Sequence, residues 1–496
     1  MRLERACGVL LHPTCLNGPF GIGDIGPAAH RYLDWLAEAG VRWWQVLPLN
    51  PTGPWQSPYN ALSSFGGNPL LISPELLVRD GVLAPSELDA LRGLPEVFVD
   101  FEALVPAKLG LLHRAFSRFL EQPPHGMTPA LATFRHEHRD WLEDLALFLA
   151  LRDAHGGVAW HQWPTDLALR RPHALASWGA QHRRDVEFHV FCQFLFDQQW
   201  RELREHARSR GVLLLGDIPI FVADDSADVW AHRELFLLDA QGQPTVVAGV
   251  PPDYFSETGQ LWGNPLYDWA ALERTGFFWW IERFRSALRL VDAARLDHFR
   301  GFVAYWEVPA DAPTASGGRW VAGPGRALFD AVRVALGDLP LVAEDLGFIT
   351  EDVTTLRREL GLPGMAVLQF AFDPAQPSSF LPYRHERNLV VYTGTHDNNT
   401  TLGWYLQDAS EAEKDFVRRY LGTDAQEIHW DMIRAALASV AALAIVPHQD
   451  LAGLGADCRM NTPGLAAGNW RFRITDWMLS DWHQQRLADL IVLYGR

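Results

Sequence analysis

The chain has 496 residues, of which 48% are hydrophobic and 21% are charged, a composition typical of a globular protein with a sizeable core. The formal net charge of −17 argues against nucleic acid and anionic membranes as partners, because both repel an acidic surface. A neutral ligand is compatible with this charge, and no apolar run approaches the length of a membrane span.

The cysteines and the N-terminal residues bear on the compartment. Cys7, Cys15, Cys192 and Cys458 are scattered, without metal-ligand spacing, so neither a disulfide framework nor a metal site is expected from them. The apolar stretch 8–11 is too short for a signal peptide and is followed by a proline. We expect a cytoplasmic protein, a monomer or weak oligomer, with no cofactor and no catalytic metal.

The first part of the chain predicts the start of an α/β fold. Strands are expected over 8–13 and 43–49, with a helix over 27–39 between them. A loop rich in proline and aromatic residues follows, and Ser57-Pro58-Tyr59 is its tip. Residues 69–154 have a helical pattern that predicts an insertion, and a long amphipathic helix over 185–210 leads back to the main fold.

The middle of the chain alternates apolar strands with loops. A third strand is expected over 211–219, with Asp217 at its tip. The segment 223–287 is predicted to be an insertion whose prolines and aromatic residues form a stiff, partly ordered lid, although a packed surface loop is the simpler alternative. A fourth strand then ends in Arg295 and Asp297, and a fifth, over 341–344, ends in Glu344.

The last part of the chain completes the count of strands. A sixth strand is predicted over 364–372, and a seventh ends at Asp397. The segment 402–455 is interpreted as a largely helical insertion, in which Ser410 and Glu413 have the form of a capping box. The eighth strand and its loop are expected over 458–464, and a closing helix over 477–494.

Eight strands, mostly alternating with helices, predict an α/β fold of the (β/α)8 TIM-barrel class, a single elaborated barrel over 1–496 whose helical and loop insertions form subdomains. Polar residues gather where the strands end, which is where barrel enzymes place their sites. An open doubly wound sheet is the alternative, but no glycine-rich phosphate loop follows the first strand.

In chain order, the fourth, fifth and seventh predicted strands each end in an acidic residue: Asp297, Glu344 and Asp397. Arg295 and Asp297 lie two residues apart and therefore face the same side of a strand, where the arginine favours an ionised carboxylate. Glu344 lies 47 residues further, which places it on the adjacent strand, whereas its neighbour Asp345 should face the other way. Two carboxyl groups of different character on adjacent strands are the pair that cleaves glycosidic bonds with retention.

Each of these residues also has a structural interpretation. An Arg-x-Asp pair is most often a structural ion pair, His396 could be a core histidine as His12 is expected to be, and Asp217 could cap a loop. The combination favours catalysis, with Asp397 and His396 holding sugar hydroxyls. Several of the 21 tryptophans lie in polar loops, where indole rings can stack on sugars.

The motifs Arg-Leu-Asp-His-Phe-Arg-Gly at 295–301, Ala-Glu-Asp-Leu-Gly at 343–347 and Thr-Gly-Thr-His-Asp-Asn at 393–398 resemble those of the amylomaltase family of 4-α-glucanotransferases, also called disproportionating enzymes. The segments 57–59, 216–219, 250–265 and 461–464 are similar to the same family, so the resemblance covers essentially the whole chain.

The resemblance implies roles for individual residues. Asp297 would be the nucleophile, Glu344 the general acid and base, and Asp397 the transition-state stabiliser. The implied substrate-binding residues are Ser57, Tyr59, Asp217, Arg295, His396 and Asn461, together with Tyr254, Phe255, Gln260 and Trp262 of the lid and Phe370 on the acceptor side. The implied partners are α-1,4-glucans: maltodextrins and chains of starch or glycogen. The implied reaction transfers a glucan segment to the 4-hydroxyl of another glucan through a covalent intermediate, with cyclic glucans formed when the acceptor is the same chain.

Three alternatives remain at this point. The chain could be an α-1,4-glucan hydrolase of the same barrel group, in which water replaces the acceptor. It could be a non-catalytic glucan-binding protein, although the acid trio argues against that. A metal-dependent barrel enzyme is a third hypothesis, which lacks a metal-binding spacing to support it.

Overall fold

The computed structural model describes residues 3–252, 257–376, 378–465 and 467–496. Its centre is a sheet of eight parallel strands, in which the order of neighbours is β10-β11-β12-β1-β2-β3-β6-β9. These strands are β1 (Ala6–Leu10), β2 (Trp43–Gln45), β3 (Leu213–Ile218), β6 (Ala293–Leu296), β9 (Leu341–Ala343), β10 (Gly364–Val367), β11 (Leu389–Tyr392) and β12 (Leu443–Pro447).

The two outer strands of this order meet and close the sheet into a barrel. The amide of Ala343 in β9 donates a 2.9 Å hydrogen bond to the carbonyl of Pro363, directly before β10. Within the sheet, Asp217 of β3 pairs with Arg295 of β6, and Leu296 of β6 pairs with Ala343 of β9. Closure with all strands parallel confirms the predicted (β/α)8 class, and the register brings the ends of β3, β6 and β9 together.

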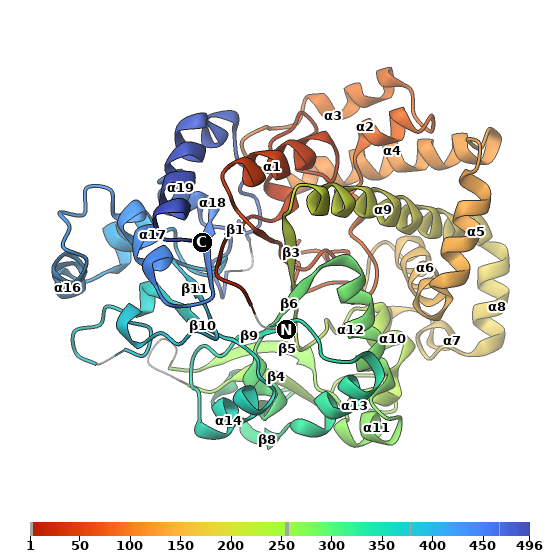
Figure 1. Ribbon diagram of the computed structural model, residues 1–496. Coiled ribbons are helices and arrows are strands. Elements are labelled where there is room, and N and C mark those ends of the chain that lie inside the picture. Colours follow the sequence, from red (N-terminus) through yellow and green to blue (C-terminus); the bar gives the residue numbers. More distant parts are fainter. Residues whose placement is uncertain (1–2, 253–256, 377, 466) are drawn as a thin grey trace.

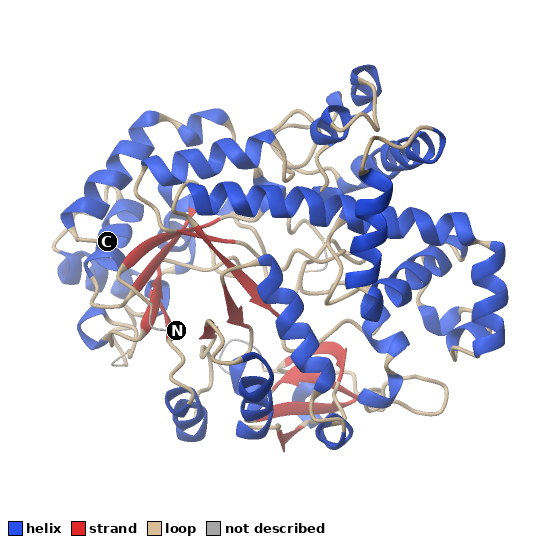
Figure 2. Ribbon diagram, turned by 45° about the vertical axis from the view of Figure 1, so that its right-hand side comes forward, coloured by secondary structure: helices blue, strands red, loops and turns tan. Residues whose placement is uncertain are grey.

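Helices surround the barrel (Figures 1 and 2). Those that follow or precede its strands are α1 (Pro27–Glu38), α9 (Arg183–Ser209), α12 (Phe278–Leu290), α13 (Arg326–Leu336), α14 (Glu351–Glu359), α17 (Ile428–Ala438) and α19 (Asp481–Leu493). Between β10 and β11 the described residues form 3-10 turns at Leu368–Phe370 and Pro382–Arg384 instead of an α-helix. The helix predicted over 185–210 corresponds to α9 within two residues at each end.

The helical insertion lies to one side of the barrel (Figure 1). It contains α2 (Pro74–Arg79), α3 (Asp89–Arg92), α4 (Phe101–Glu121), α5 (Met127–Glu137), α6 (Arg139–Ala154), α7 (Thr165–Ala168) and α8 (Pro172–Gln181). The prediction ended the helical stretch at residue 154, so it missed α7 and α8. Glycine and proline residues interrupt the pattern between residues 155 and 172, and they concealed two short helices.

A second, antiparallel sheet occupies part of the segment predicted as a lid (Figure 2). Its strands are β4 (Val246–Val250), β5 (Gln260–Pro265), β7 (Ala304–Pro309) and β8 (Arg319–Ala322), in the order β5-β4-β7-β8. In the chain, the short helix α10 (Ala227–Ala231) precedes β4 and the short helix α11 (Trp269–Arg274) follows β5. The predicted insertion 223–287 also takes in most of α12, the helix that leads into β6.

The prediction of the eighth strand is wrong. The strand is β12, within the segment 402–455 that was interpreted as a helical insertion, and it pairs with both β11 and β1. The rest of that segment is helical: α15 (Thr401–Gly403), a π-helical turn (Trp404–Asp408), α16 (Glu411–Leu421), α17 and α18 (His448–Leu451), and Ser410 forms the predicted capping box. A short apolar run beside helices cannot be told from buried helix by its periodicity. The segment 458–464 instead follows a 3-10 turn at Ala456–Cys458.

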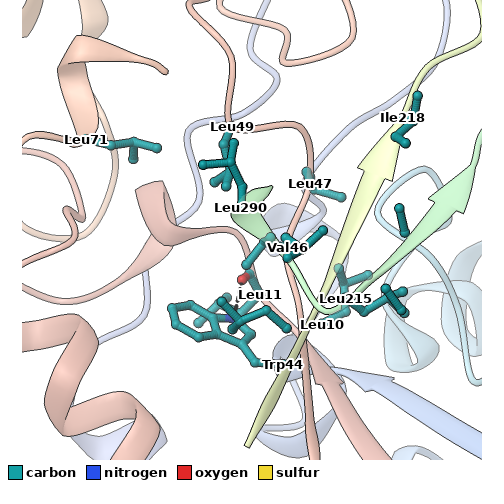
Figure 3. Packing of buried hydrophobic residues seen from close by; sticks show 14 of the residues in the cluster. Leu10, Leu11, Trp44, Val46, Leu47, Leu49, Leu71, Leu215, Ile218 and Leu290 are labelled. Carbon is teal, nitrogen blue, oxygen red and sulfur yellow. Dashed lines mark hydrogen bonds between the residues drawn. The ribbon is translucent and has the colours of Figure 1, made fainter. Parts of the chain in front are cut away.

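The core is continuous from the barrel into the helical insertion. Trp44 of β2 is fully buried, and its indole N–H donates a 2.7 Å hydrogen bond to the carbonyl of Leu11. Figure 3 shows this ring beside Leu10, Leu11 and Leu215. A paired N–H is favourable for a buried indole, and this contact fixes the end of β1 against β2. Among the described residues, no helix is both long and apolar enough to cross a membrane.

Candidate active site

The ends of neighbouring barrel strands bring acidic side chains together. Asp297 directly follows β6 and Glu344 directly follows β9, and these two strands pair side by side. Asp217 lies near the end of β3, on the other side of β6. Asp397 follows β11. All four therefore lie at the carboxyl-terminal face, where the loops of a barrel build its site.

Arg295 is the centre of the polar contacts on this face. Its buried guanidinium donates to the Asp217 carboxylate from Nε at 2.9 Å, to the Asp297 carboxylate from Nη2 at 2.8 Å, and to the Tyr59 hydroxyl at 3.2 Å. The predicted orientation of Arg295 and Asp297 to the same side is confirmed. One buried cation thereby aligns two carboxylates from adjacent strands, which fixes their positions before any ligand arrives.

Asp217 is fully buried yet has one carboxyl oxygen without a partner. Its Oδ2 accepts from Arg295 and from the Tyr59 hydroxyl at 2.7 Å, whereas its Oδ1 has no hydrogen-bond partner among the described residues. Burial raises the pKa of Asp217, although the charge of Arg295 opposes the change. A buried acceptor that lacks a partner is suited to a ligand hydroxyl.

Glu344 is held by two main-chain amides. Its Oε2 accepts from the amide of His298 at 2.7 Å and its Oε1 from the amide of Leu346 at 3.0 Å. Burial, with the nearby charge of Asp297, raises the pKa of Glu344 to about 8 despite these hydrogen bonds. Asp345 faces the other way as predicted, and it forms a 3.0 Å ion pair with Arg357.

Asp397 has the opposite electrostatic character. Its side chain is 48% exposed, its Oδ1 accepts from the Asn461 amide at 2.6 Å, and its Oδ2 lies 3.3 Å from Nε2 of His396. Removal from water would by itself raise the pKa of Asp397, but His396, Asn461 and the charge of Arg295 together lower it to about 2. The carboxylate is therefore ionised across the whole range in which proteins are normally folded.

An aromatic wall joins the two halves of the site. The rings of Tyr59 and His396 are stacked, with centroids 4.9 Å apart and planes 9° from parallel. The hydroxyl of Ser57 accepts from the amide of Tyr59 at 3.3 Å, so this serine shapes the turn that presents the tyrosine. Ser57, Tyr59 and His396 thus lie together with the acids, as the sequence predicts.

The residues predicted for the lid are only partly described. Trp262 of β5 lies against His298 with ring centroids 4.9 Å apart, and its indole N–H donates to Gln260 at 3.1 Å. The main-chain amide of His298 contacts Glu344, so His298 contacts both Trp262 and the acid. Phe370 is 45% exposed and lies near Phe380. Tyr254 and Phe255 lie outside the described residues.

The sequence and the fold were then compared with known proteins. A family model described as 4-alpha-glucanotransferase matches residues 11–479. The chain belongs to the 4-α-glucanotransferase family. It is 50% identical to the 4-alpha-glucanotransferase of Synechocystis sp. over 99% of this chain and 98% of that protein, and 49% identical to that of Thermus thermophilus over 98% of both. These matches confirm the resemblance found in the sequence.

Solved structures agree with this assignment. The amylomaltase from Streptococcus agalactiae in complex with acarbose superimposes with a TM-score of 0.96 at 36% identity, covering 99% of this chain and 100% of that one. The amylomaltase from Corynebacterium glutamicum shares the fold at 19% identity, with a TM-score of 0.79, 99% of this chain and 76% of that one. The chain is thus an enzyme of glycosyl transfer, and its family acts on α-1,4-glucans.

Sequence reasoning missed three residues of this 4-α-glucanotransferase site. His298 lies inside the recognised motif, but its contact with Glu344 depends on a left-handed backbone, φ 47°, that a motif does not reveal. Arg459 donates from Nε to the carbonyl of Asn461 at 2.7 Å and from Nη2 to the carbonyl of Asp397. Trp470 lies 6.0 Å from both Tyr59 and His396. Arg459 and Trp470 lie in a loop whose course cannot be predicted from the local sequence.

Over the described ranges, no group of three or more His, Cys, Asp and Glu side chains could hold a metal ion. The expectation that catalysis needs no metal remains a prediction, and it is tested by chelation: activity on maltotriose should be unchanged after exhaustive treatment with EDTA.

Proposed function

We propose that the protein transfers α-1,4-glucan segments by a retaining mechanism, with Asp297 as nucleophile and Glu344 as general acid and base. The observation that supports this most strongly is the hydrogen bond from the amide of His298, the residue after Asp297, to the Glu344 carboxyl group. It joins the two strand ends directly. The raised pKa of Glu344 leaves it protonated at neutral pH, as an acid requires.

In the first step, a carboxylate oxygen of Asp297 attacks the anomeric carbon of the donor sugar. The bond from that carbon to the glycosidic oxygen breaks, and Glu344 gives its proton to the departing 4-oxygen. The products are a glucosyl ester of Asp297 and a free glucan end. The ionised Asp397 would bind hydroxyls of the sugar and stabilise the positive charge that develops on the ring.

The second step uses the same groups in reverse. Ester formation removes the negative charge of Asp297, one of the two causes that raise the pKa of Glu344, so this pKa falls and the carboxylate becomes a base. Glu344 takes the proton of an acceptor's 4-hydroxyl, the oxygen attacks the anomeric carbon, and the bond to Asp297 breaks. An acceptor from the same chain would give a cyclic glucan.

Substrate contacts are assigned on the same basis. The unpartnered Oδ1 of Asp217, the Tyr59–His396 stack and Asn461 would hold the sugar that is attacked. Gln260 and Trp262, with Tyr254 and Phe255, would cover the bound glucan, and Phe370 would contact the acceptor. A cover of this kind excludes water, which favours transfer over hydrolysis.

The proposal extends to partners and compartment. Maltodextrins and chains of starch or glycogen are the expected partners, and the charge of −17 opposes binding to nucleic acid. We expect a monomer or weak oligomer. None of the four cysteines forms a disulfide, and three of them are buried, which fits a reducing, cytoplasmic compartment.

Incubation with pure maltotriose tests the proposal. Longer maltodextrins and glucose should appear while the total of reducing ends stays constant, because each transfer breaks one bond and forms one. Reducing ends that rise without longer products would instead identify an α-1,4-glucan hydrolase. Unchanged maltotriose and unchanged amylose would contradict catalysis altogether and favour a glucan-binding protein.

A further inference from the structure

Two tryptophans are exposed in the outer layer of the barrel, on elements that carry none of the acids. Trp477 belongs to the 3-10 turn Asp476–Leu479, and Trp482 to the first turn of α19, at the left of Figure 1. Their exposed fractions are 54% and 55%. Indole is the largest apolar side chain, so two such rings in water on neighbouring turns need an explanation other than core packing.

Hydrogen bonds place the two rings toward the catalytic face. The amide of Ile474 donates at 2.7 Å to the carbonyl of Cys15, in the turn that follows the end of β1. At the other end of α19, the guanidinium of Arg496 donates at 3.0 Å to the carbonyl of Ala6, where β1 begins. The helix therefore runs downward from the catalytic face, and Trp477 and Trp482 lie at its upper end.

The two rings are held in place by the same histidine. The centroid of His483 lies 5.9 Å from that of Trp477 and 4.9 Å from that of Trp482. His483 is itself buried, and its Nδ1 lies 2.8 Å from the hydroxyl of Ser480. Both indoles thus belong to one preorganised surface, so the two tryptophan side chains would lose little conformational entropy when a ligand stacks on them.

Trp482 is fixed further by its neighbours on α17. Its ring meets the buried ring of Trp430 at 88°, with centroids 6.1 Å apart. The guanidinium of Arg486 lies 5.0 Å from the ring of Trp482 and 4.5 Å from that of Trp430. Arg486 also forms two hydrogen bonds with Glu427, at 2.7 and 2.6 Å. Its charge is therefore neutralised, which suits an uncharged ligand better than a phosphate or an acidic peptide.

We propose that Trp477 and Trp482 form an indole platform that binds an α-1,4-glucan chain outside the active site. The flat apolar faces of successive glucose units stack on the two rings, and their hydroxyls stay in water. The proposal rests on the proposed function only in the identity of the ligand, because the same enzyme acts on that polymer.

The platform acts by raising the local concentration of long substrates. A chain that reaches from the platform to the active site binds at two places at once, so its second contact is intramolecular. A short oligosaccharide fills the active site alone and gains nothing. The platform therefore lowers KM for long amylose and leaves maltotriose unaffected.

Steady-state transfer and affinity electrophoresis test this inference. Trp477→Ala and Trp482→Leu are compared with the wild type on maltotriose and on long-chain amylose, and their migration is measured in gels that contain glycogen. Leucine keeps the apolar contact with Trp430 and removes the flat ring. We expect KM for amylose to rise about three- to tenfold and retardation in the gel to weaken, with kcat/KM for maltotriose unchanged.

Phe278→Ala is the matched control, because Phe278 is 59% exposed on α12, across the barrel from the platform. This variant should behave as the wild type on both substrates. Equal KM values for amylose in the wild type and the platform variants would overturn the platform. Sedimentation of the same variants tests whether the two rings instead contact a second copy of the chain. A changed dimer fraction without a change in gel retardation would also overturn the platform. A wild type inactive on maltotriose would instead contradict the proposed function, so the two failures are distinguishable.

Discussion

The ends of β9 and β11 place the same chemical group in opposite environments. Glu344, after β9, is partly buried near the Asp297 carboxylate and accepts hydrogen bonds from two main-chain amides, and its pKa rises to about 8. Asp397, after β11, accepts a hydrogen bond from the Asn461 amide and lies beside Nε2 of His396. Its side chain remains half exposed, and its pKa falls to about 2. One barrel face therefore carries one carboxyl group with a raised pKa and one with a lowered pKa, and the neighbours of each group, not its type, decide the direction.

Removing the charge of Asp297 is expected to have the largest effect. Asp297→Asn leaves no nucleophile, so transfer from maltotriose should fall by about 10⁴-fold or more. The same change deletes one cause of the raised pKa of Glu344, which should therefore fall. Carboxyl titration by NMR can follow this shift in the inactive variant. Activity at the wild-type rate would refute the assignment of Asp297.

Replacing Glu344 by glutamine should lower the rate of transfer less than Asp297→Asn does, because the nucleophile remains. Loss of the general acid typically costs about 10²- to 10⁴-fold. A glycosyl fluoride donor needs little protonation of its leaving group, so formation of the glucosyl ester from maltosyl fluoride should be much less impaired than from maltotriose. Equal losses with both donors would mean that Glu344 acts in some other way than as an acid.

The pH profile of the wild type tests the comparison without mutation. The first step needs protonated Glu344, so kcat/KM for maltotriose should fall as the pH rises through about 8, by about tenfold for each further unit. Asp397 is ionised far below that range and should add no inflection between pH 4 and 8. Glu344→Gln should lack the alkaline limb. A wild-type profile flat to pH 10 would show that Glu344 does not carry the proton.

The sequence was sufficient to place the acids near strand ends and to predict the barrel class. Asp297, Glu344 and Asp397 each end an apolar strand and lie in a long motif, so local pattern located them, and the spacing of 47 residues placed the first two on adjacent strands. The parallel pairing of β6 and β9 confirms that placement.

Features that depend on tertiary contacts could not be predicted from the sequence. The strand β12 is short and apolar and lies between helices, so no periodicity distinguished it. Trp470 has a left-handed backbone, φ 65°, and meets Tyr59 and His396 from a distant loop. Such a contact is determined by the path of the loop over the finished barrel, which single residues do not encode.

The smallest effect concerns the backbone of His298, which links the lid to the acid. Its φ of 47° aims the amide at Glu344, and histidine tolerates this left-handed conformation better than a β-branched residue does. Burial lowers the pKa of its ring to about 4, so the ring is neutral at pH 7 and its removal takes away no charge. The side chain and the backbone can therefore be tested separately.

His298→Val and His298→Gly form the matched pair for this test. Valine disfavours φ > 0, so the amide should move away and Glu344 should lose a hydrogen bond that stabilises its ionised form. The alkaline limb of kcat/KM should then shift upward by up to about one pH unit. Glycine adopts this φ freely and should keep the limb, losing only the ring contact with Trp262. Both variants could instead keep the alkaline limb of the wild type and lose thermal stability to the same extent. The left-handed conformation of His298 would then be structural only. The pKa of Glu344 would be set by burial and by the charge of Asp297, without a contribution from the His298 amide.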